Sequence, residues 1–185
     1  MDRNQALELL RTHVKNENLV KHCLASEAVL RALAQRLGGD PELWGLAGLL
    51  HDIDVELTAG DPARHTHEAA RILSERGLPA ELIEAVKLHN EPAHAGQRRT
   101  SAFHRALAAG ETVTGMITAT ALVYPDRRLA SVKASSVTKR MKDKRFAASV
   151  DRSAILECEQ LGLKLDEFVQ LSLDAMRSVS SDLGL

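Results

Sequence analysis

Apolar residues recur along the chain at the three- and four-residue spacing of one helix face. Between positions 19 and 37 they stand at 19, 23, 24, 28, 30, 33, 34 and 37. This spacing is typical of amphipathic helices, and no stretch of useful length alternates as a half-buried strand would. The pattern predicts helices over residues 7–10, 19–37, 40–51, 62–76, 79–89, 101–124, 153–161 and 166–179.

The predicted helix boundaries coincide with residues that favour helix starts and stops. Gly38 and Gly39 follow one helix, and Asp40-Pro41 and Asp61-Pro62 have the cap-then-proline order of a helix start. Pro125 stops the long helix before it. There is no internal repeat or low-complexity linker. We therefore expect one all-α domain over residues 1–185, in which residues 126–185 form a helical C-terminal extension of the same unit.

Composition narrows the class of protein. The chain has 185 residues, 44% hydrophobic and 26% charged, which is ordinary for a globular domain. No apolar run approaches the roughly 20 residues of a membrane span, and no signal-peptide pattern is present. Cys23 and Cys158 form no disulfide framework and suit a reducing compartment. We expect a cytoplasmic protein with no membrane partner.

The charge is distributed unevenly. Residues 126–145 contain eight basic and two acidic residues, although the whole chain has a net charge of −1. Such a segment suits a solvated helix face with a lysine-rich turn, or a basic flap over an anionic substrate. The small net charge gives no reason to expect a nucleic acid duplex as partner.

The candidate functional residues begin where an apolar run ends. Residues 43–50 are mostly apolar and lead directly into His51, Asp52 and Asp54, so these charges start inside the protein. A buried carboxylate needs a neutralising partner. Other predicted helices also carry an imidazole or carboxylate, and bundle cores are where such ligands converge on metals. The candidate ligands are His22, His51, Asp52, His65, His89 and Glu111.

Taken singly, these residues also have ordinary explanations. A lone helical histidine is more often a surface or hydrogen-bonded core residue than a ligand. His51 could meet the negative end of its helix dipole, and Glu111 could face solvent. Asp54 could orient a ligand or take part in catalysis, or it could cap the following turn.

The order and spacing of these residues resemble the HD superfamily of metal-dependent phosphohydrolases, which is named for a His-Asp doublet. The resemblance rests on His22, the doublet His51-Asp52 and a later carboxylate on a long helix, and it covers roughly residues 19–123. It implies an all-α bundle with these residues as metal ligands. The family's fourth ligand is an Asp in a segment resembling AADELTG. Here residues 109–115 read AGETVTG, which places Glu111 at that position with a side chain one methylene longer.

Two further segments resemble those of dinuclear members. Residues 65–70, HTHEAA, resemble the pattern HxxxGA and select His65, and residues 84–90, EAVKLHN, supply His89. The doublet's Asp bridges both ions in such sites, which would make Asp52 the shared ligand. The resemblance thus implies one or two divalent ions, drawn from Fe, Mn, Zn, Co, Ni or Mg.

The family implies an enzyme, a metal-dependent hydrolase that cleaves a phosphomonoester or phosphodiester with a metal-activated hydroxide. No serine or cysteine nucleophile motif and no phosphate-binding glycine fingerprint stands out. We expect a small phosphate ester, nucleotide-like, as substrate. The candidate phosphate contacts, each of which also suits solvated surface, are Lys87, Arg98, Arg99, Lys139 and Arg140.

Two alternatives stay open from the sequence. Some dinuclear iron members of the superfamily are oxygenases, and the ligands alone do not separate the two chemistries. The change to Glu111 also motivates a non-catalytic domain that binds a nucleotide as a sensor. The last two helices leave both a monomer and a homodimer open.

Overall fold

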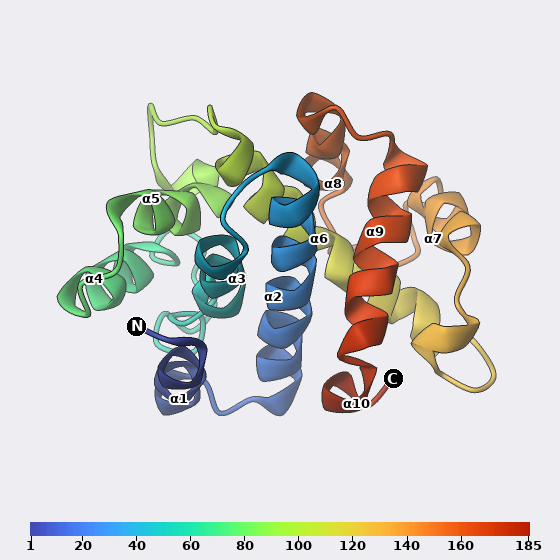
Figure 1. Cartoon of the computed structure of the whole chain (residues 1–185), viewed down its shortest axis with the longest axis horizontal. Helices are drawn as coiled ribbons and strands as arrows, with labels where there is room; N and C mark the ends of the chain where they lie inside the picture. The colour runs from blue at the N-terminus through green and yellow to red at the C-terminus, as the bar shows by residue number, and fades with distance from the viewer.

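Two 21-residue helices, α2 and α6, form the centre of the molecule. In the computed structural model, which describes all residues 1–185, α2 packs against α3, α6 and α9 (Figure 1). The fold is all-α, as predicted. Its α-helices are α1 (Arg3–His13), α2 (Glu17–Leu37), α3 (Pro41–Leu50), α4 (His67–Glu75), α5 (Ala80–His89), α6 (Ala102–Leu122), α7 (Ala134–Met141), α8 (Arg152–Leu156), α9 (Leu165–Ser178) and α10 (Ser180–Leu183), with short 3-10 helices at Glu91–Ala93, Leu129–Ser131 and Glu157–Leu161.

Local capping explains why the helices that carry the site begin and end where predicted. The side chain of Asn16 accepts a hydrogen bond at the start of α2, and Gly38 ends that helix in the left-handed conformation with φ 77°. Asp40 accepts from the first backbone N–H groups of α3, and Pro41 occupies the first helical position. The predicted stops at residues 37 and 50–51 are therefore confirmed.

One predicted helix start is wrong. The sequence suggested a helix from residue 62, but residues 61–66 form turns and α4 begins only at His67. Thr66 has φ 78°, a left-handed conformation that no α-helix accommodates in its interior. His65 consequently lies in the turn before α4 and not within a helix. The predicted helix at 153–161 also divides into α8 and a 3-10 helix, and α7 was not foreseen.

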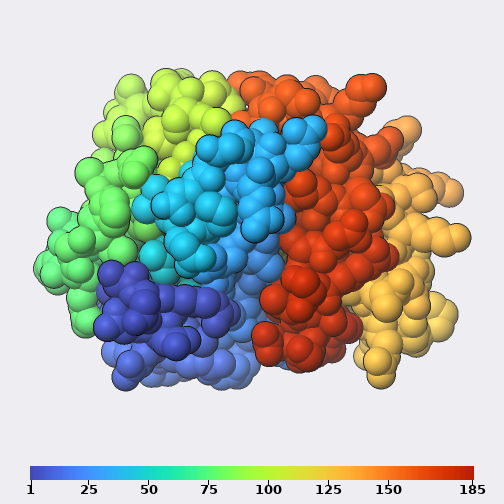
Figure 2. Space-filling view, viewed as in Figure 1, coloured from blue at the N-terminus to red at the C-terminus, as the bar shows by residue number.

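A single apolar core joins the N-terminal and C-terminal parts of the chain. Its buried side chains include Leu10 of α1, Leu30 of α2, Val137 of α7 and Phe168 of α9. On the face shown in Figure 2, residues of α9 lie directly beside α2. The segment after α6 therefore packs on the same core as the helices of the site. Every helix is too short or too polar to span a lipid bilayer.

The contact between α2 and α3 is unusually close at Gly48. A Cβ atom there would lie 2.7 Å from the carbonyl oxygen of Ser26 and 2.9 Å from the backbone nitrogen of Glu27. Only glycine lets the two backbones approach this far. The approach matters for function because His51 follows Gly48 by one helical turn and faces His22 of α2.

Candidate metal centre

The end of α3 and the middle of α2 bring together the first group of candidate ligands. His22 Nε2 and His51 Nε2 lie 3.1 Å apart. Both atoms face the same carboxylate oxygen, Asp52 Oδ2, at 3.6 Å and 3.4 Å. The three ligand atoms are close enough to one another to hold a single ion.

A second group faces the other oxygen of Asp52. His65 Nε2 lies 3.3 Å and His89 Nε2 3.6 Å from Asp52 Oδ1, and the two nitrogens are 3.0 Å apart. His89 is the last residue of α5, whereas His65 comes from the turn before α4. These three residues form a second set able to hold an ion. Asp52 is shared by both sets.

The hydrogen bonds behind the four rings determine which nitrogen is free. The outer nitrogen, Nδ1, of His51 donates to the carbonyl oxygen of Gly48 at 2.9 Å, and that of His89 to the carbonyl oxygen of Val86 at 2.6 Å. A carbonyl oxygen only accepts, so the proton of each neutral ring is on Nδ1. The Nε2 atom of each ring is therefore an unprotonated lone pair directed at Asp52.

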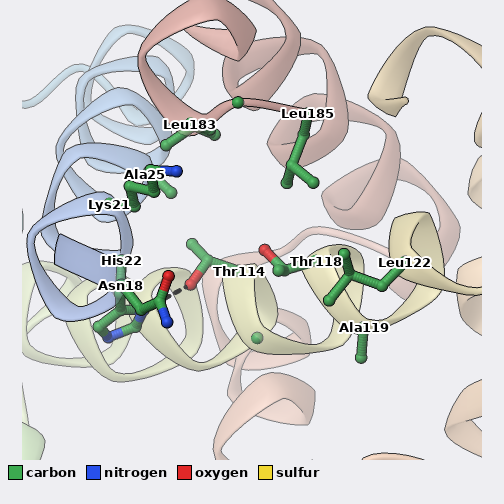
Figure 3. Close-up of a pocket in the computed structure, with 12 residues that line it drawn as sticks. Asn18, Lys21, His22, Ala25, Thr114, Thr118, Ala119, Leu122, Leu183 and Leu185 are labelled. Atoms are coloured by element: carbon green, nitrogen blue, oxygen red, sulfur yellow. Dashed lines mark hydrogen bonds between the residues drawn. The ribbon is translucent and has the colours of Figure 1, made fainter. Parts of the chain in front are cut away.

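The other two rings are oriented in the same way by side chains. His65 Nδ1 lies 2.7 Å from Asp54 Oδ1, and His22 Nδ1 lies 2.9 Å from the hydroxyl oxygen of Thr114. The Thr114 hydroxyl donates its own proton to the carbonyl oxygen of Glu111, so it accepts from His22. Figure 3 shows this contact as the dashed line between the two side chains.

With all four rings neutral, as metal binding requires, four imidazole lone pairs and one carboxylate would converge without a proton between them. Lone pairs about 3 Å apart repel one another unless a positive charge lies among them. Neutral imidazole nitrogens with a carboxylate form the donor set of Fe, Mn, Zn, Co and Ni sites in proteins. The residues present therefore fit one or two divalent cations, with Asp52 as the ligand common to both.

Ionisation on the α2 side of the cluster agrees with this arrangement. Burial lowers the pKa of His22 and lowers that of His51 to about 3, although Asp52 opposes the shift. Both rings are therefore neutral near pH 7. Burial would raise the pKa of Asp52, but the neighbouring rings of His51, His65 and His89 outweigh burial and hold it well below its usual range.

Two other groups, one on each side of the cluster, have pKa values raised above neutrality. Burial lowers the pKa of His65, but hydrogen bonds to Asp52 and Asp54 outweigh burial and raise it to about 9. Burial raises the pKa of Glu111 to about 8. When no cation is bound, both groups would carry a proton near pH 7, His65 because two carboxylates face it and Glu111 because its carboxyl group is buried.

Glu111 lies at the edge of the cluster. Its Oε2 is 3.7 Å from His22 Nε2, and its Oε1 accepts the hydroxyl proton of Thr112. It belongs to neither tight group of three, so its role as a ligand remains a prediction. It lies on the α2 side of the cluster, with His22.

Asp54 lies behind the cluster, fully buried. One oxygen faces His65, and the other accepts the backbone N–H groups of Thr66 at 2.8 Å and Ala69 at 2.9 Å. It thereby satisfies free N–H groups at the start of α4, where Thr66 makes no side-chain cap. Asp54 is placed to orient His65 and not to contact an ion in the cluster.

Of the candidate phosphate contacts on α5 and in the loop after it, two form ion pairs within the protein. Lys87 is half-buried on α5. Arg98 is largely exposed and pairs with Glu91 at 2.6 Å. Arg99 binds Glu157 at 2.6 Å and the carbonyl oxygen of Leu88 at 2.8 Å, so its guanidinium is already engaged.

The basic segment lies away from the candidate ligands. Lys139 lines a separate hollow together with Lys142 and Lys164. Arg140 donates to the carbonyl oxygen of Ser136 and lies over the ring of Phe146. The structure shows no flap formed by these two side chains over the cluster.

Thr114 was missed from the sequence, although a signal was available. It follows Glu111 by three residues and therefore lies on the same helix face. A hydroxyl there can position the histidine of the opposing helix.

Comparison with known proteins agrees with this geometry. A family model described as HD domain matches residues 19–122. Ribonuclease Y of Opitutus terrae is 29% identical over 76 residues, which are 41% of this chain and 14% of the ribonuclease. Ribonuclease Y of Deinococcus radiodurans is 29% identical over 77 residues, 42% of this chain and again 14% of the relative. The chain therefore matches only a small part of the length of these relatives, and no solved structure gives a significant match. Since the family match covers more than half of the chain and contains every residue of the cluster, the chain belongs to the HD domain family.

Proposed function

We propose that this protein is a metal-dependent phosphohydrolase that cleaves a phosphomonoester or phosphodiester of a nucleotide-like small molecule. The observation that carries the proposal is the convergence of four imidazole Nε2 atoms on the two oxygens of one carboxylate. His22 and His51 would hold one cation and His65 and His89 the other, with Asp52 common to both. Glu111 would complete the set on the His22 side.

The chain's own residues would hold the cations and orient the rings of the ligand histidines. Divalent cations, when bound, lower the pKa of a water ligand towards neutrality and offset charge on phosphate oxygens. With cations bound, Asp54 would accept a hydrogen bond from Nδ1 of His65 and Thr114 one from Nδ1 of His22, which would leave both Nε2 atoms free to face the ions. The cluster remains accessible because the side chain of Asp52 is 14% exposed.

The comparisons support hydrolysis of a phosphate ester but do not identify the substrate. The name ribonuclease denotes cleavage of phosphodiester bonds in those relatives. The matched part is short, so we extend to this chain only hydrolysis of a phosphate ester. A small substrate, without nucleic acid duplex or membrane, remains our proposal, as does a cytoplasmic location.

The first test is metal content. Elemental analysis of protein purified without chelator should find about two ions per chain in the wild type. His65→Ala and Glu111→Ala should each lower that content, and both should lose hydrolysis of a panel of phosphate esters. His13→Ala, on α1, is the matched histidine control and should change neither quantity.

The other outcomes separate the rival functions. One ion, lost only in Glu111→Ala, would indicate a mononuclear phosphohydrolase. Bound iron with consumption of dioxygen and no ester hydrolysis would indicate an oxygenase. Protein that takes up no metal after reloading, yet binds nucleotides, would leave the sensor as the better description.

A further inference from the structure

A groove of about 460 Å³ lies beside the metal cluster. It runs between α2 and α6 and is closed on its third side by the last residues of the chain (Figure 3). On α6 it follows a single helix face from Thr114 through Thr118 to Leu122. Glu111 belongs to the same face, one turn before Thr114.

His22 connects this groove with the cluster. Its ring lines the groove, while its Nε2 faces Asp52 and Glu111 on the other side. The side chain of His22 is 26% exposed, so the ring is not sealed off from the groove. A phosphate ester bound at the cluster would therefore have its remaining atoms within reach of this groove.

The groove has one cationic side chain and two apolar sides. Lys21 lines it next to His22 and forms no ion pair with any carboxylate side chain. Its ammonium lies near Gly184, where an added Cβ atom would be 3.2 Å from Lys21 Nζ. Leu122 is 51% exposed beside it, and Leu185 faces it from the end of the chain.

These properties indicate the kind of ligand that the groove would bind. Sites for small organic molecules have volumes of about 300–1,000 Å³ and apolar walls with a few polar groups. The groove is within that range and is far larger than one phosphate needs. An unpaired lysine in such a groove attracts an anionic group on the ligand.

We propose that this groove binds the organic part of the substrate, and that Lys21 binds a second phosphate on it. The preferred substrate would then be a nucleoside-sized ester with two phosphate groups, one at the cluster and one at Lys21. Thr118 and Asn18 supply hydrogen bonds to the sugar or base. This inference rests on the proposed phosphohydrolase function.

The first experiment narrows the groove without touching the cluster. Ala119 lines the groove and is half-buried, so Ala119→Phe should fill part of it. We expect kcat/KM for a nucleoside 3′,5′-bisphosphate to fall about 10-fold or more, and that for phenyl phosphate to stay within about twofold. Metal content should not change. Ala80→Phe, at an exposed position at the start of α5, is the matched control.

The second experiment removes the positive charge of Lys21. Lys21→Met should lower kcat/KM for the bisphosphate about 10-fold and for the 5′-monophosphate about twofold or less, because only the former carries the second phosphate. Lys144→Met removes an equally charged but exposed side chain outside the groove and serves as control. Calorimetric titration of the bisphosphate in the presence of chelator, where no turnover takes place, should show weaker binding to both groove variants.

The two proposals fail in different ways. If no phosphate ester is hydrolysed by the metal-loaded wild type, the proposed function fails. If phenyl phosphate is hydrolysed but Ala119→Phe and Lys21→Met leave bisphosphate binding and kcat/KM unchanged, the groove proposal alone is overturned. Absence of bisphosphate binding by the wild type at millimolar concentration would overturn it as well.

Discussion

Asp54→Asn is expected to disable His65 as a ligand while leaving the fold intact. One oxygen of Asp54 accepts two backbone N–H groups, and the other accepts from His65. The amide of the variant would keep its oxygen towards the two N–H groups, because the reverse orientation loses two hydrogen bonds instead of one. Its NH₂ group would then face His65 Nδ1 and donate to it. The proton of the neutral ring would move to Nε2, the atom that should face the cation.

The expected loss of metal affinity follows from this change of tautomer in His65. To bind a cation, the His65 ring of the variant must return its proton to Nδ1. This breaks the new hydrogen bond and leaves the Nδ1–H group facing the NH₂ group of the amide, two donors with no acceptor between them. Loss of one buried hydrogen bond costs about 1–3 kcal/mol, and changes behind a ligand typically weaken metal affinity about 10- to 100-fold. The free energy of unfolding should fall by only about 1 kcal/mol, the effect of removing a charge near the start of α4.

The assay combines calorimetric Zn²⁺ titration with NMR of the histidine ring nitrogens. One of the two binding events should weaken, and the metal-free variant should show His65 protonated at Nε2. Asp61→Asn, in the exposed turn before His65, is a matched control that should not affect binding. Unchanged affinity for both ions, or a His65 proton that stays on Nδ1, would refute the tautomer argument.

Three further predictions concern the scaffold. Gly48→Ala should destabilise the protein by about 3 kcal/mol and lower Tm by about 6–12 °C, because its Cβ would meet rigid backbone. Gly110→Ala should stay within about 1 kcal/mol, because its Cβ meets movable leucine side chains and alanine favours the helix; equal Tm losses would contradict this reasoning. Burial, followed by the charges of neighbouring groups, lowers the pKa of His94 to about 4, so the unfolded chain takes up a proton first as the pH falls. The free energy of unfolding should therefore decrease between about pH 6.5 and 4, by up to about 3 kcal/mol, and urea titrations of His94→Gln should show a smaller decrease over that range. Arg99→Met should cost about 2–4 kcal/mol by leaving Glu157 unpaired, whereas KM for a phosphate ester should not change; a raised KM would restore Arg99 as a substrate contact.

Local signals accounted for most helix boundaries. The caps of α2 and α3 lie within three residues of the groups they satisfy, so the sequence alone indicates them. The start of α4 is different because the carboxylate that satisfies its N–H groups, Asp54, lies 12 and 15 residues before Thr66 and Ala69. A local reading assigns that role to Asp61 and begins the helix too early.

The candidate site was predictable as a set of residues but not as a set of tautomers. The resemblance selected the histidines and Asp52, and the structure brings them together. The partners that place the proton on His51 and His89 are backbone carbonyl groups, which every residue has and no sequence pattern distinguishes. The pairing of Arg99 with Glu157 could not be predicted for a related reason, since Glu157 lies 58 residues away.

The scaffold explains how donors that repel one another are held close together. Lone pairs as close as those of His22 and His51 would separate if their helices were free to move. The close backbone contact at Gly48 and the surrounding apolar core, which includes Cys23 and Leu50 beside these two ligands, prevent that movement. Packing of the residues next to these ligands thus holds the donors close to one another. A cation held by these donors would relieve repulsion that the apolar core otherwise sustains.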